Sequence, residues 1–242
     1  MLYHLLYPLR DFFFAFNIFQ YISFRAVGAA ITALFISFLL GPRVIRMLIR
    51  LQVGETIRDT GPESHQMKVG TPTMGGALII LSIVIPTLLW AKVGDIHIQI
   101  LLLATIWMGL IGFFDDYLKV VKKYPEGLIA RYKMAGQITL GLVVGYLVLT
   151  YPTVTELRTV ISVPFIANGH LDIGWLYIPL VILVVTGTSN AVNLTDGLDG
   201  LATGLVAIAT LAFAAIAYAS GRFDYSDYLN ILYLPGTGEL FI

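Results

Sequence analysis

Residues 200–220 read GLATGLVAIATLAFAAIAYAS, and no charged side chain occurs between Asp199 and Arg222. A transmembrane helix needs about 20 apolar residues to cross roughly 30 Å of hydrocarbon. Six charge-free stretches of this kind occur along the chain, and each runs for roughly 17 to 23 residues, close to the spanning length. Six transmembrane helices are therefore predicted, near residues 24–48, 74–92, 98–115, 134–151, 175–193 and 200–219.

The composition also indicates a membrane protein. Of the 242 residues, 57% are hydrophobic and 12% are charged, and the mean hydropathy is +0.83. A soluble domain carries about 25% charged residues, so this chain has too few polar side chains to cover a soluble core. Cysteine is absent, which excludes disulfides and thiolate chemistry. The zero net charge gives no indication of nucleic acid as a partner. We expect an all-α transmembrane bundle that forms one membrane domain over residues 1–242.

The basic residues predict the orientation. Lysine and arginine concentrate in the loops 41–73 and 116–133, which lie on one side of a six-span bundle together with 194–199. Loops rich in lysine and arginine stay in the cytoplasm. The remaining connections and the N-terminus are then expected to face outward.

The two flanks carry separate expectations. Residues 12–24 are rich in aromatic side chains, which favour the membrane interface. Residues 239–242 resemble the start of a further helix, so a C-terminally truncated chain is expected, with about six complete spans plus the start of another.

Two carboxylates stand at the cytoplasmic end of the third predicted span, in FFDDY at 113–117. Carboxylates next to hydrocarbon are costly and are functional candidates. Mg²⁺ binds one or two carboxylates together with phosphate oxygens, so Asp115 and Asp116 suit a metal–pyrophosphate site. The alternative is a solvated helix end, in which nearby lysines balance the two charges.

A second polar group interrupts an apolar region in NAVNLTDGLDG at 190–200. On a helix, Asn190, Asn193 and Asp196 share one face, and Asp199 extends it. Amides and carboxylates together can bind a metal-bound phosphate or the edge of a base. The alternative is a turn rich in Asn and Asp that joins two helices.

A third segment, residues 59–76, precedes the second span. Lys68 supplies a point charge for phosphate, and Thr73 can cap the helix that follows. The alternative is an ordinary loop that enters a helix.

The sequences of these segments resemble those of a known family. GPESH and GTPTMGG (61–65, 70–76), FFDDYLKV and GLIARYK (113–120, 127–133) and NAVNLTDGLDGLA (190–202) are similar to the MraY family of phospho-N-acetylmuramoyl-pentapeptide-transferases, within the polyprenyl-phosphate N-acetylhexosamine-1-phosphate transferases. The resemblance extends from about Phe24 to the last residue. It implies a fold of ten transmembrane helices, a multi-pass position in the bacterial inner membrane and an active site on the cytoplasmic face.

The resemblance also implies a reaction. Phospho-MurNAc-pentapeptide moves from UDP-MurNAc-pentapeptide to undecaprenyl phosphate, which gives lipid I and UMP in peptidoglycan synthesis and requires Mg²⁺. Asp115 and Asp116 match catalytic and metal-binding positions, with Asp115 as the expected base. The nucleotide side matches Asn193, Asp196 and Asp199, supported by Asn190, while Lys68 and Thr73 match positions near the nucleoside. A homodimer is a further expectation.

Length is the departure from the family pattern. Family members carry roughly another third of chain, with a third metal-binding Asp and a His-rich loop. We therefore expect the 242-residue chain alone to be inactive. Two alternatives remain open: a sister transferase that uses UDP-GlcNAc, and an ion-coupled membrane transporter. A transporter favours polar groups near the midplane of the membrane, whereas these segments lie at the cytoplasmic helix ends.

Overall fold

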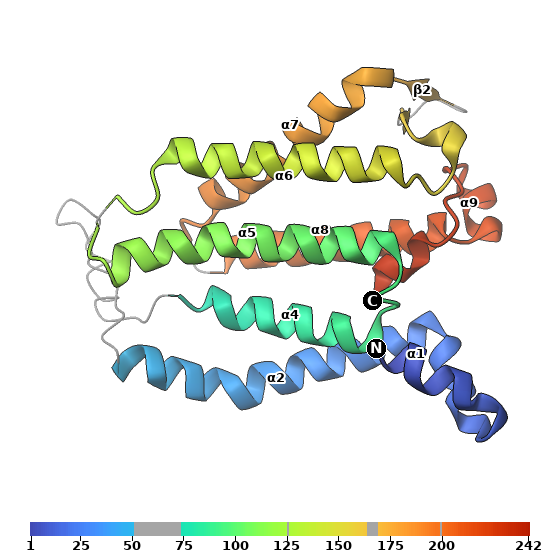
Figure 1. Ribbon diagram of the computed structural model, residues 1–242, viewed down its shortest axis with the longest axis horizontal. Coiled ribbons are helices and arrows are strands. Elements are labelled where there is room, and N and C mark those ends of the chain that lie inside the picture. Colours follow the sequence, from blue (N-terminus) through green and yellow to red (C-terminus); the bar gives the residue numbers. More distant parts are fainter. Residues whose placement is uncertain (51–73, 125, 164–168, 199) are drawn as a thin grey trace.

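The computed structural model describes residues 1–50, 74–124, 126–163, 169–198 and 200–242. Six apolar helices make up most of this part of the chain (Figure 1). They are α2 (Ile22–Arg50), α4 (Gly76–Trp90), α5 (Ile96–Val120), α6 (Ala130–Thr150), α7 (Tyr177–Thr195) and α8 (Leu201–Ser220). Each coincides with a predicted span, so the all-α polytopic class is confirmed. Five are long and apolar enough to cross a membrane, whereas α4 is shorter, with 15 residues.

Helices that follow one another in the chain pack side by side. α4 packs against α2 and α5, and α6 packs against α5 and α7. α8 contacts α7 and the short 3-10 helix η5 (Thr237–Phe241), which also reaches α5 and α2. α6 is thus a packing partner of both α5 and α7.

Small residues set the close approach of α6 and α7. Gly141 and Gly145 are buried on α6 and face Ile182 and Ile178 of α7. A Cβ atom on Gly141 would lie 2.8 Å from the Cα atom of Ile182, which is too close for any side chain. Small residues at helix contacts are typical of membrane proteins, where packing rather than hydrophobic burial holds helices together.

The outer surface of the bundle is apolar. Among the described residues, only six hydrophobic side chains are buried (Ala29, Leu48, Ala91, Ile98, Leu140 and Ala202). By contrast, Leu211 and Phe213 on α8 are 71% and 72% exposed. Hydrocarbon rather than water must surround such a surface, because its backbone groups are paired within helices and its side chains are apolar. The chain is a multi-pass membrane protein.

The connections gather at two opposite ends of the bundle (Figure 1). At the end we call the inner end lie the connections α5–α6 and α7–α8, as predicted for the cytoplasmic loops. At the outer end lie the α4–α5 connection, a two-stranded antiparallel hairpin and the N-terminal segment. The short elements at the outer end are α1 (Leu2–Leu6), η1 (Tyr7–Asp11), η2 (Phe14–Gln20), η3 (Thr155–Leu157), β1 (Val160–Ser162), β2 (His170–Asp172), η4 (Gly174–Leu176) and α9 (Phe223–Leu229).

A buried ion cluster joins distant parts of the chain at the outer end. Arg25 is fully buried, and its Nη1 and Nη2 atoms donate to the two carboxylate oxygens of Glu239, each at 2.6 Å. Lys92 Nζ lies 3.0 Å from Oε1 of the same carboxylate. Burial raises the pKa of Glu239, but the hydrogen bonds and charges of Arg25 and Lys92 outweigh burial and hold that pKa below its ordinary value. This cluster was not predicted. Glu239 belongs to the short helix η5, and the start of a further span there stays a prediction, as does the single domain.

Candidate functional site

Asp115 is held from three sides near the end of α5. Lys119 Nζ, one helical turn further on, donates to Oδ2 at 2.9 Å. Lys133 Nζ, from the first turn of α6, lies 2.8 Å from Oδ1. The backbone N–H of Leu128 donates to Oδ1 at 2.8 Å. The carboxylate is therefore compensated by two ammonium groups, and it connects α5 to the start of α6.

The α5–α6 connection closes tightly over this carboxylate. Gly127 is buried and has a φ of +62°, a left-handed conformation that favours glycine. A Cβ atom there would lie 2.5 Å from Oδ1 of Asp115 and 2.6 Å from Cε of Lys119. Gly127 thus allows the backbone to approach the ion pair and places the N–H of Leu128 on the carboxylate.

A second polar contact joins α6 to α7. Asn190 Nδ2 donates to Oε1 of Gln137 at 2.9 Å and to the backbone oxygen of Thr186 at 2.8 Å. Gln137 is buried, and its Nε2 donates to Oγ of Ser189 at 3.0 Å. Both atoms of the Gln137 amide are therefore used to join α6 to α7.

One face of α6 connects the two polar groups. Lys133 holds Asp115, and Gln137, four residues later, holds Asn190. Residues four apart lie on the same face of a helix, one turn apart. The first two turns of α6 therefore set the position of α5 relative to α7 at the inner end, where the predicted site residues occur.

The remaining predicted residues fall into two groups. Asp116 is half-buried next to Asp115, while Asn193 and Asp196 are exposed at the end of α7 and just after it. Lys68, Thr73 and Asp199 lie outside the described residues. The structure thus brings the two polar segments at 115–116 and 190–196 to one end of the bundle, where Asp115 and Asn190 each contact a side chain of α6.

The arrangement suits phosphate chemistry at a membrane surface. Lysine ammonium groups attract phosphate oxygens, and the carboxylates of Asp116 and Asp196 are hard oxygen donors of the kind that Mg²⁺ prefers. No group of three or more His, Asp or Glu side chains among the described residues is arranged to hold a metal ion.

Gln137 and Gly127 were not predicted as site residues. Of these two residues, Gln137 could have been found from the sequence, because it is an amide within an apolar span, where polar side chains are costly. Gly127 stands in a polar connection where a glycine is unremarkable, so the close approach of the backbone to Asp115 had no signature in the sequence.

Comparison with known proteins supports one family. Residues 98–238 match the model of glycosyl transferase family 4. The chain is 46% identical over 242 residues to the phospho-N-acetylmuramoyl-pentapeptide-transferase of Desulfotalea psychrophila, covering 100% of this chain and 67% of that protein. It is 50% identical over 240 residues to that of Citrifermentans bemidjiense and 51% identical over 240 residues to that of Pelobacter propionicus, each covering 99% of this chain and 66% of the relative.

The similarity includes every element that forms the candidate site. The matched family region begins in α5 and ends in η5, so it contains Asp115, Lys133, Gln137 and Asn190. The chain spans about two thirds of the length of the curated relatives. The chain belongs to glycosyl transferase family 4 and, within it, to the family of the phospho-N-acetylmuramoyl-pentapeptide-transferases.

Proposed function

We propose that the protein transfers phospho-MurNAc-pentapeptide from UDP-MurNAc-pentapeptide to undecaprenyl phosphate, with lipid I and UMP as products. The observation that carries this proposal is the identity of 46 to 51% to phospho-N-acetylmuramoyl-pentapeptide-transferases along 99 to 100% of the chain. The chain spans about two thirds of the length of those relatives. The proposal therefore assigns a reaction to the site residues of this chain and not full activity to the chain alone.

The position of the polar groups supports this reaction. A lipid phosphate stays in the bilayer while a nucleotide stays in the cytosol, so the two can meet only at the membrane surface. The ion-paired Asp115 and the amide of Asn190 both lie at the inner end of apolar helices. A reaction between two anions needs positive charge close by, and Lys119 and Lys133 supply it.

Asp115 and the two lysines form the proposed lipid-phosphate side of the site. A phosphate monoester is mostly deprotonated at pH 7, so a proton acceptor contributes little at this step. The three hydrogen bonds that Asp115 accepts favour a positioning role, in which its carboxylate orients Lys119 and Lys133. The role of base, which the family resemblance implies for Asp115, stays a prediction.

Mg²⁺ is the proposed cofactor, and when bound it would neutralise the charge of the pyrophosphate. The proposed metal ligands are Asp115 and Asp116, and in the structure two lysines and a backbone N–H already contact the carboxylate of Asp115. The nucleotide side is assigned to Asn193, Asp196 and Asp199 with Asn190 in support, and the nucleoside to Lys68 and Thr73. The proposed setting is a homodimer in the bacterial inner membrane.

The test measures lipid I formation from labelled UDP-MurNAc-pentapeptide, undecaprenyl phosphate and Mg²⁺. Two proteins are compared: the chain itself, and a chimera that carries the remaining third of the Citrifermentans bemidjiense relative. Formation of lipid I by the chimera would support the proposal. In the chimera, Asp116→Asn should lower this activity at least about 100-fold, whereas the outer-end control Asp224→Asn should retain it. Transfer from UDP-GlcNAc in place of UDP-MurNAc-pentapeptide would assign the sister reaction instead.

A further inference from the structure

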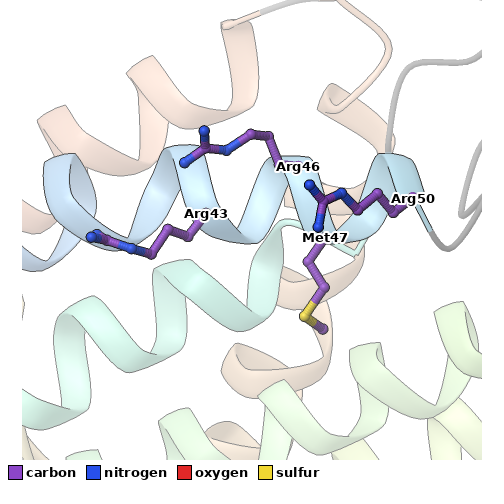
Figure 2. A pocket seen from close by; sticks show the side chains of 4 residues that line it. All are labelled: Arg43, Arg46, Met47 and Arg50. Carbon is purple, nitrogen blue, oxygen red and sulfur yellow. The ribbon is translucent and has the colours of Figure 1, made fainter.

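Three arginines line one face at the inner end of α2. Arg43, Arg46 and Arg50 are exposed and are spaced so that their side chains share a face of the helix. Together with Met47 they line a hollow of about 570 Å³ (Figure 2). Neither the proposed reaction nor the ion pairs around Asp115 involve these residues.

The position along α2 places the three charges at the level of lipid headgroups. The 21 residues from Ile22 to Arg43 rise by about 32 Å at 1.5 Å per residue. That length matches the hydrocarbon thickness of about 30 Å. The arginine face therefore begins where the apolar span ends, on the side where basic residues gather.

The guanidinium groups retain donors for a ligand. Arg43 Nη1 donates to the backbone oxygen of Leu39 at 2.7 Å, and Arg46 Nε donates to that of Pro42 at 3.0 Å. Figure 2 shows all three side chains turned the same way, back along the helix toward its apolar part. A guanidinium has five N–H donors, and no ion pair joins these three groups to any acidic residue of the described chain.

Apolar side chains flank the arginines on the same helix. Ile45, Met47 and Ile49 are 48%, 58% and 55% exposed. A ligand that fits both features carries an anionic phosphate next to hydrocarbon. A soluble nucleotide would leave the exposed apolar flank against water, whereas a lipid would place its headgroup on the arginines and its chains on the flank.

We propose that Arg43, Arg46 and Arg50 form a binding site for the phosphodiester headgroup of an anionic phospholipid of the cytoplasmic leaflet. Each basic residue near an anionic membrane surface adds to the electrostatic attraction between the protein and the lipid headgroups. Arginine also matches phosphate oxygens with paired N–H donors. The site is separate from the proposed transferase reaction and needs no turnover to be detected.

The test measures lipid binding to the purified chain by native mass spectrometry with phosphatidylglycerol and with phosphatidylcholine. Replacing all three arginines by glutamine should lower phosphatidylglycerol binding on the order of 100-fold and leave phosphatidylcholine binding unchanged. The matched control is Lys122→Gln with Lys123→Gln, two exposed basic residues at the same end, in the α5–α6 connection. An equal loss in the control, or no loss in the arginine variant, would overturn the proposal.

A second measurement uses the unaltered chain and so does not depend on the folding of a variant. A photoactivatable phosphatidylglycerol should label residues 43–50, and a photoactivatable phosphatidylcholine should label them at least ten times less. Equal labelling by both lipids would contradict recognition of the headgroup charge. If undecaprenyl phosphate added before irradiation prevents labelling and unlabelled phosphatidylglycerol does not, the arginines belong to the lipid-substrate site. That result would also overturn the proposal.

Discussion

Asp115 and Asn190 each belong to a polar segment at the end of an apolar span in the sequence, but the structure gives them different surroundings. Asp115 accepts from two lysines and a backbone N–H, so its charge is compensated before any substrate arrives. Within the described residues Asn190 donates to neutral groups, the amide oxygen of Gln137 and a backbone oxygen. The contacts of Asp115 therefore place positive charge where an anion can bind, whereas the contacts of Asn190 hold α6 and α7 together.

Gly127→Ala tests the closure of the backbone over Asp115. The added Cβ would meet Oδ1 of Asp115, and the left-handed φ disfavours alanine. We expect a loss of about 1–3 kcal/mol, seen as a lower Tm in detergent. Gly204→Ala on α8, where nothing lies within 4 Å, is the control and should leave the Tm unchanged or slightly higher. Equal Tm values for both variants would contradict the strained closure.

The sequence predicted where these residues lie but not what they contact. The charge-free spans predicted that Asp115 and Asn190 lie near helix ends, and both residues do lie near the ends of α5 and α7. Their partners depend on the rotation of α6 about its axis, which is set by the contact of Gly141 with Ile182. Such packing leaves no signal in charge patterns, so Lys133 and Gln137 could not be assigned to their partners in advance.

At the scale of elements, α6 is the helix on which the site depends. Lys133 and Gln137 project from it toward α5 and α7, respectively. Contacts of this kind matter in a membrane bundle, because helices gain little from hydrophobic burial against each other.

Gln137→Leu tests this role of α6. It removes the partner of Asn190 and Ser189 while keeping a side chain of similar size. Hydrogen bonds between membrane helices are worth about 0.6 to 1.7 kcal/mol, and we expect a loss in that range, measured by thermal unfolding in detergent. Thr139→Val is the matched control, since the Thr139 hydroxyl donates only to the backbone of its own helix. A loss no larger than that of Thr139→Val would contradict the role assigned to Gln137.

Glu239 gives η5 a stability that depends on pH. Its pKa is depressed in the folded chain, so its contribution is complete above its ordinary value of 4.5 and is lost as the pH falls through the folded-state pKa. Glu239→Gln leaves Arg25 buried without a counter-charge, which costs about 3–5 kcal/mol. The Tm difference from wild type should be constant between about pH 6 and 8 and shrink in acid, below the ordinary pKa of 4.5.

The exposed residue Glu156 on η3 provides the control for this titration. Glu156→Gln should leave the Tm near that of wild type across the same range, because Glu156 is exposed and forms no ion pair within the described residues. A Tm difference for Glu239→Gln that does not change with pH would show that the carboxylate of Glu239 is not the group that titrates.

At the scale of the whole molecule, the two ends of the bundle carry different chemistry. The inner end holds lysines and arginines on α2, α5 and α6 together with the paired carboxylate. The outer end holds aromatic 3-10 helices, a hairpin and the buried Arg25–Glu239 pair. The predicted grouping is confirmed for the α5–α6 and α7–α8 connections. The outer ion cluster was beyond sequence reasoning, because its partners are 214 residues apart.

The absence of cysteine makes the orientation directly measurable. In intact cells a membrane-impermeant maleimide should label Ser162→Cys in the outer hairpin and not Lys122→Cys in the α5–α6 connection. Both positions are exposed, so both should react once the membrane is permeabilised. The unmodified chain is the blank. The reverse pattern would invert the orientation that the basic residues predict.

The Arg25–Glu239 pair also has a consequence for the order of events during synthesis. Arg25 is at the start of α2 and is fully buried, yet the carboxylate that balances it is translated 214 residues later. At about 5–20 residues per second, the ribosome needs on the order of 10 to 40 s to reach Glu239. Until then the guanidinium needs water, lipid headgroups or a chaperone as its partner. The ion pair at the outer end can therefore form only after η5 has been synthesised, which makes it a late step of folding in the membrane.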